Sequence, residues 1–163
     1  MTSNKTLAEA PRQELDAIEL LMQDHREVES LFREFEYLQG RDEDAGRVVH
    51  TACAELKMHD TLNTELFRPA VLEAAGEAGL ERLLAEVEDG QQTIRDLIEQ
   101  VEQTDADHDK RDAHFSALAE HVERQFKEAE TQVFPQAKKL KRLDLMSVAA
   151  EMKARKSAIM AEI

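Results

Sequence analysis

The sequence predicts an all-α protein, an up-down-up-down four-helix bundle with an additional C-terminal helix. Three observations predict this fold. Apolar residues recur every three to four positions through each long segment, which is the period of one helix face. The 163 residues include only 5 Gly and 3 Pro, so few positions break a helix or form a hairpin. Long amphipathic helices joined by short connections pack as a bundle.

The chain is predicted to form one bundle domain of residues 14–163, preceded by a flexible, polar lead-in of residues 1–13. A chain of this length suits one domain with a sizeable core. The first helix is expected from about Glu14 to Leu38, and Gly40 is expected to stop it. The second helix is expected from about Glu43 to Phe67.

Glycine, proline and aspartate separate the remaining helices. Pro69 is expected to kink the chain before a break at Gly76 and Gly79. The other three helices are expected at about Gly79 to Glu102, Lys110 to Lys139 and Leu143 to Ala161. Pro135 is expected to bend or interrupt the fourth helix. Gly90 lies inside the third helix at a cost of roughly 1 kcal/mol relative to Ala. That position therefore calls for a close-packing or functional explanation.

The formal net charge of −14 restricts the classes of partner. Nucleic acid and anionic membranes both require a basic counter-surface, so neither is predicted, and an unknown protein partner stays open. No apolar run has the length of a membrane span, and Met1 to Gln13 lack the apolar stretch of a secretory signal. A cytoplasmic location is therefore expected.

Cys53 is the only cysteine, which excludes an intrachain disulfide and a thiolate metal cluster.

Polar residues interrupt the core stripe of every bundle helix. They are His25 in the first helix, His59 and Asn63 in the second, Gln91 in the third and Gln125 in the fourth. Each stands where the spacing calls for an aliphatic side chain, so we expect one polar layer near the middle of the bundle. A histidine in an apolar stripe must find a partner when the helix packs. That partner is either a metal ion or a neighbouring polar side chain, and the pattern alone leaves both open.

Short motifs flank the polar layer. They are Asp16-Ala17-Ile18-Glu19-Leu20-Leu21, Asp24-His25-Arg26-Glu27-Val28 with Phe32, His59 with Glu65-Leu66-Phe67-Arg68-Pro69, Phe134-Pro135, and Leu143-Asp144-Leu145 with Met152 and Arg155-Lys156. In these motifs, over about Leu15 to Lys156, the chain resembles the hemerythrin-like HHE cation-binding family. The resemblance implies a hemerythrin-like bundle with a non-haem diiron centre. It implies His25 and His59 as retained metal ligands.

The resemblance also implies four ligand positions that carry other residues in this chain. A carboxylate position falls on Asn63, two histidine positions fall on Gln91 and Gln125, and a glutamate position falls on Ala129. Amides bind such cations weakly and alanine not at all, so two iron ions would lack bridging carboxylates. His121 lies one turn before Gln125 on the same face and is the candidate for a displaced ligand of a single metal. Of the nearby acids, Glu65 is expected to face away from the layer and Asp60 to reach only its edge.

Two functional hypotheses follow. The first is a hemerythrin-like protein with a degenerate diiron site and no cofactor at full occupancy. It would act as a non-enzymatic binding or regulatory module, with the imidazole and amide groups of the layer hydrogen-bonded to one another directly or through buried water. The second is an atypical mono- or dinuclear iron site that handles oxygen, peroxide, nitric oxide or iron. The sequence has no nucleophile elbow, Gly-rich phosphate loop or zinc-protease motif, so it does not support an enzyme of another kind.

Overall fold

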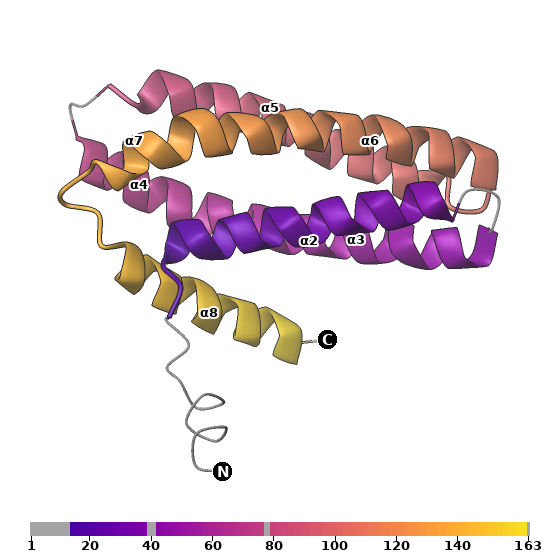
Figure 1. The fold of residues 1–163 in the computed structure, drawn as a ribbon, viewed down its shortest axis with the longest axis horizontal. Helices are drawn as coiled ribbons and strands as arrows, with labels where there is room; N and C mark the ends of the chain where they lie inside the picture. The colour runs from indigo at the N-terminus through magenta and orange to yellow at the C-terminus, as the bar shows by residue number, and fades with distance from the viewer. Residues whose placement is uncertain (1–13, 39–41, 77–78, 163) are drawn as a thin grey trace, which may run out of the picture.

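The computed structural model describes residues 14–38, 42–76 and 79–162, and the predicted lead-in of residues 1–13 and Gly40 lie outside them. Four long helices form the bundle: α2 (Ala17–Tyr37), α3 (Asp42–Leu62), α5 (Glu81–Gln103) and α6 (His108–Glu128). Figure 1 shows α2 beside α3 and α5 beside α6, with the two pairs stacked. No strand occurs in the described ranges. The predicted all-α bundle is confirmed.

Side-chain caps set the helix starts and explain why the predicted bounds differ by two or three residues. The Asp16 side chain accepts a hydrogen bond from the Glu19 backbone at 2.9 Å, and the Glu19 side chain accepts one from the Asp16 backbone at 3.0 Å. This capping box begins α2 at Ala17, after the expected Glu14. Asp107 caps α6, which therefore begins at His108 and not at Lys110.

Both helices that contain a proline remain helical through it. α3 continues through the π-helical segment η1 (Asn63–Phe67) into α4 (Arg68–Ala75), and α6 continues through η2 (Ala129–Val133) into α7 (Phe134–Lys138). A proline ring collides with the carbonyl four residues earlier in an α-helix. In η1 the Arg68 amide bonds to the Asn63 carbonyl, and in η2 the Phe134 amide bonds to the Ala129 carbonyl, five residues back in each case. The α-helix is thus interrupted before Pro135, but by a wider π-helical segment that keeps the chain helical through the proline.

The additional C-terminal helix, α8 (Leu145–Ala161), packs obliquely across α2, α3 and η1 (Figure 1). Asp144 caps it by accepting a hydrogen bond from the Ser147 backbone at 3.0 Å. Met152 of α8 is 2% exposed, so its side chain is buried where α8 packs on the bundle.

At the break between α4 and α5, Gly76 and Gly79 have φ of 52° and 81°, which other residues rarely adopt. Within the described residues, no helix is long and apolar enough to cross a membrane.

The core consists of two hydrophobic clusters. The first includes Val28, Leu56 and Ile94, and the second includes Leu21, Leu62 and Val87. On each of three helices, one polar side chain lies between a member of each cluster: His25 between Leu21 and Val28, His59 between Leu56 and Leu62, and Gln91 between Val87 and Ile94. The polar positions therefore form one layer between two apolar halves of the bundle.

Candidate polar site in the bundle core

A small cavity lies at the polar layer. It has about 30 Å³ of space for water. Its polar lining consists of His25, His59, Asn63 and Arg68, and its apolar lining consists of Leu21, Phe67, Leu84, Val87, Ala129, Val133 and Phe134. A buried water needs at least about 10–15 Å³ by this measure, so the cavity has room for about two.

His25 is 1% exposed and contacts an aromatic ring and a carboxylate. Its ring stacks on Phe126 with centroids 3.8 Å apart, and its Nδ1 lies 2.7 Å from Oε2 of Glu130. The same oxygen accepts a hydrogen bond from Arg26. Burial, aided by the nearby His59 and Arg26, lowers the pKa of His25 to about 2 because the charged ring would be desolvated. The ring is therefore neutral, Nδ1–H donates to Glu130, and Nε2 keeps its lone pair.

His59 makes the corresponding contact with an acid on the neighbouring helix. It is 7% exposed, and its Nδ1 lies 3.2 Å from Oδ2 of Asp24 on α2. Its ring centroid is 5.0 Å from that of His25, with 62° between the ring planes. The two imidazoles thus share the cavity, and each directs Nδ1 to a carboxylate.

The amides of the layer do not bond to the histidines. Gln125 Nε2 donates to the Val87 carbonyl oxygen at 2.8 Å. A Cβ at Gly90 would lie 2.2 Å from Oε1 of Gln125, so the glycine permits this close approach between α5 and α6. Gln91, which follows Gly90 on α5, is buried, with 7% of its surface exposed. In the described residues, no hydrogen bond joins two of the layer's imidazole and amide side chains. The expected direct hydrogen bonds between these side chains are therefore wrong, because carboxylates outside the stripes are stronger acceptors for the histidines.

Glu130 and Arg68 are site residues that the sequence analysis missed. Glu130 follows Ala129 in η2, where the π-helical geometry changes the direction of side chains relative to the α-helical period. The sequence signal for this segment is the proline at Pro135, because both π-helical segments precede a proline. Arg68 lines the cavity and pairs with Glu88 on α5.

The nearby acids on α3 and η1 are engaged by arginines. Asp60 accepts two hydrogen bonds from Arg95, at 2.7 and 2.8 Å, and is absent from the cavity lining. Glu65 accepts a hydrogen bond from Arg155 of α8 at 3.0 Å. Glu65 thus faces α8 and not the polar layer, as its helical position predicts.

His121 lies apart from the other two histidines. It is half-buried on α6, its Nδ1 is 3.3 Å from Nη2 of Arg124, and its Nε2 is buried without a hydrogen-bond partner. The residues that line the cavity do not include it. Across the part of the chain that the structure describes, no group of three or more His, Cys, Asp or Glu side chains is placed to hold a metal ion.

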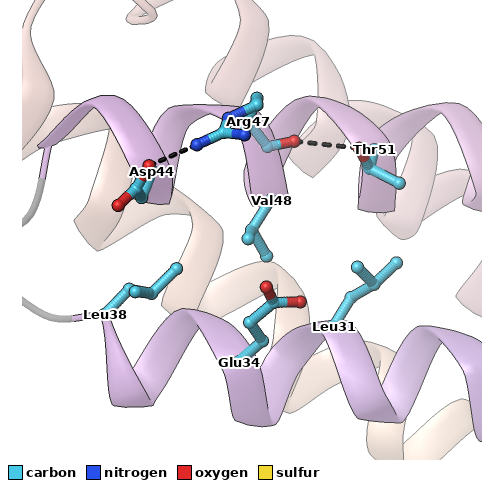
Figure 2. A pocket seen from close by; sticks show the side chains of 7 residues that line it. All are labelled: Leu31, Glu34, Leu38, Asp44, Arg47, Val48 and Thr51. Carbon is cyan, nitrogen blue, oxygen red and sulfur yellow. Dashed lines mark hydrogen bonds and ion pairs between the residues drawn. The ribbon is translucent and has the colours of Figure 1, made fainter.

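A larger surface hollow, of about 400 Å³, lies between α2 and α3 near their connection. Figure 2 shows that Arg47 reaches Asp44 and that the Thr51 hydroxyl bonds to the Arg47 carbonyl, at 2.9 Å, along its α3 side. These polar groups satisfy one another and include no histidine or cysteine. The core cavity, and not this hollow, is the candidate site.

The chain is thus a helical bundle with two histidines directed into its core. The family model for the hemerythrin HHE cation binding domain matches residues 16–137. The chain therefore belongs to the hemerythrin HHE cation-binding domain family, and α8 lies beyond the matched residues. No curated protein and no solved structure matches the chain.

Proposed function

We propose that this chain is a hemerythrin-like protein whose diiron site is degenerate, and that it acts in the cytoplasm as a non-enzymatic binding or regulatory module. The observation that carries the proposal is that the carboxylates beside the two histidines already have hydrogen-bond partners within the protein. Glu130 accepts hydrogen bonds from both His25 and Arg26, and Asp24 contacts His59. The acids nearest the histidines are thus engaged by protein groups.

The side chains around the cavity do not fit a pair of iron ions. The positions that the family resemblance implies for two carboxylates hold Asn63 and Ala129, which bring no negative charge. Two buried divalent ions would then face two neutral imidazoles. The Arg68 guanidinium, only 14% exposed, lines the same cavity and adds a like charge. Coulomb repulsion and the absence of bridging carboxylates both disfavour a dinuclear site.

The backbone supports placing the cavity at the family's metal position. η1 begins at Asn63 and η2 begins at Ala129, the two positions implied for carboxylate ligands. π-helical turns occur frequently at functional sites, where they re-aim side chains. We infer that the chain keeps the backbone of a ligand site while its ligand side chains differ.

A second candidate function is an atypical iron site at His25 and His59 that handles oxygen, peroxide, nitric oxide or iron. The contacts of Nδ1 with Glu130 and Asp24 favour it. In metalloproteins a carboxylate on one ring nitrogen orients the histidine and raises the basicity of the other nitrogen toward metal. The two hypotheses thus make different use of the same pair of imidazoles.

Equilibrium dialysis of the full chain against ferrous iron without oxygen separates them, with iron measured by elemental analysis. The degenerate site predicts substoichiometric iron that is unchanged in a His25→Gln/His59→Gln variant. One iron per chain that is lost in this variant supports the second function and contradicts the first. Two irons per chain, with the near-ultraviolet absorption of an oxo bridge, contradict a degenerate site outright.

A further inference from the structure

The end of α7 and the connection that leads from it to α8 concentrate positive charge in an acidic protein. Lys138, Lys139, Lys141 and Arg142 lie within five consecutive positions, whereas the whole chain has a net charge of −14. No other five-residue stretch of the sequence holds as many basic residues. This cluster, residues 138–142, is called the basic connection below.

The four cations of the basic connection are exposed and available. All four side chains are exposed, and within the described ranges none of them forms an ion pair or a side-chain hydrogen bond. By contrast, Arg26, Arg68 and Arg95 each pair with a carboxylate on another helix. The basic connection therefore offers charge that the fold itself does not use.

The backbone of the basic connection is held in place by its own turns and by the core. Two tight turns follow each other, with Leu140 N bonded to the Ala137 carbonyl at 3.1 Å and Leu143 N bonded to the Leu140 carbonyl at 3.2 Å. Leu140 and Leu143 are half-buried against the second hydrophobic cluster. Because these leucines already hold the connection in place, the connection would lose little conformational entropy when a ligand binds.

A surface hollow lies at each end of the basic connection. One, of about 360 Å³, is lined by Leu80, Gln136, Lys139 and Leu140. The other, of about 290 Å³, is lined by Ala70, Glu73, Ala74, Arg142, Leu143, Asp144, Ser147 and Val148. Both hollows have apolar walls. The first also holds the basic Lys139, and the second holds Arg142 together with the acids Glu73 and Asp144.

We infer that the basic connection docks an acidic peptide segment of a protein partner, in which carboxylates alternate with apolar side chains. The carboxylates would pair with the lysines and the arginine, and apolar side chains would enter the two hollows. A peptide can confine itself to this small surface. A flat anionic bilayer or a nucleic acid would extend past it and meet the strongly acidic remainder of the chain. The inference does not depend on the metal content of the core.

Fluorescence anisotropy tests this inference with the full chain and a labelled peptide of alternating glutamate and leucine. Two probe peptides serve as controls, one with lysine for glutamate and one with serine for leucine. The test variant is Lys139→Glu/Lys141→Glu/Arg142→Glu. The matched control, Arg33→Glu/Lys110→Glu/Lys127→Glu, makes the same change in net charge at exposed side chains without ion pairs.

The wild-type chain is expected to bind the acidic peptide saturably, more weakly as salt rises, and in preference to both control peptides. The test variant should lose at least about tenfold in affinity and the matched control less than about twofold. Circular dichroism should show that both variants keep the helical fold. Equal losses in the two variants, no saturable binding, or self-association through the basic connection would each overturn the inference. So would binding of anionic vesicles or RNA without binding of the peptide.

Discussion

The Gly90→Ala substitution tests how closely α5 and α6 pack at the polar layer, because it adds one methyl group between them. In a helix interior, alanine is more favourable than glycine by about 1 kcal/mol. Here the new Cβ would lie 2.2 Å from Oε1 of Gln125, so that side chain must swing away. It would then lose its 2.8 Å hydrogen bond to the Val87 carbonyl. That loss costs about 1 kcal/mol, or up to about 3 kcal/mol if the amide stays buried and unpaired. We therefore expect Gly90→Ala to change the free energy of unfolding by between about zero and a loss of about 2 kcal/mol.

The same substitution should change sign when Gln125 is first shortened. In a Gln125→Ala background the methyl group meets no amide, so Gly90→Ala should stabilise the chain by about 1 kcal/mol. The coupling between the two positions is then about 1–3 kcal/mol. Urea unfolding followed by circular dichroism measures it in the four proteins of the cycle. Gln100→Ala, an exposed glutamine on the same helix, is the matched control and should leave the effect of Gly90→Ala unchanged. An equal gain in the wild-type and Gln125→Ala backgrounds would refute the packing argument.

Three further outcomes are expected. The folded pKa of His25 is about 2 against an ordinary 6.5, so the unfolded chain binds more protons between these values. Stability should therefore fall as the pH drops below 6.5, by up to about 1.4 kcal/mol per pH unit from this residue. Urea titrations across pH should show a shallower loss in His25→Phe, and an unchanged slope would contradict the assignment. Burial raises the pKa of the Cys53 thiol to about 12, so Ellman's reagent should modify Cys53 slowly. The comparison is an Ala54→Cys thiol in a chain without Cys53, which should react far faster because Ala54 is exposed. Equal rates would show that Cys53 is accessible. Under α8, Met152→Ala should lower the free energy of unfolding by about 2–5 kcal/mol, whereas Arg155→Ala, which removes an exposed ion pair, should lower it by at most about 1 kcal/mol. Thermal or urea unfolding distinguishes the two, and the reverse order would mean that charge and not packing holds α8.

The fold and the polar layer can be predicted from the sequence because both depend on helical periodicity. His25, His59 and Gln91 interrupt apolar stripes at one level of the bundle, and the structure places each of them between the two hydrophobic clusters. Gly90 was also informative, because a glycine inside a long helix predicts either close packing or function, and it packs against Gln125.

The partners of the histidines depend on features that a regular helical period does not contain. Glu130 reaches His25 from η2, whose π-helical geometry departs from the period on which the prediction was based. Asp24 meets His59 across two helices, so their contact depends on how α2 and α3 are rotated against each other. His121 shares a helix face with Gln125, yet its position along α6 separates it from the cavity lining.

The central claim is that the polar layer occupies the family's metal position with its ligand side chains replaced. Restoring the implied ligand types tests it, in the variant Asn63→Glu, Gln91→His, Gln125→His and Ala129→Glu. Without metal the variant should be less stable than the wild-type chain, because it buries two carboxylates that no cation offsets. Iron that binds only the folded state should then raise its melting temperature.

The deciding measurement is the iron content per chain of the wild type and of this variant after the same loading with ferrous iron. We expect two irons per chain in the variant, with a higher melting temperature than its metal-free form, and substoichiometric iron in the wild type. A folded variant that takes up no iron would contradict the placement of the ligand positions on α5 and α6. A wild-type chain that holds two irons would contradict the claim that its ligands have been replaced.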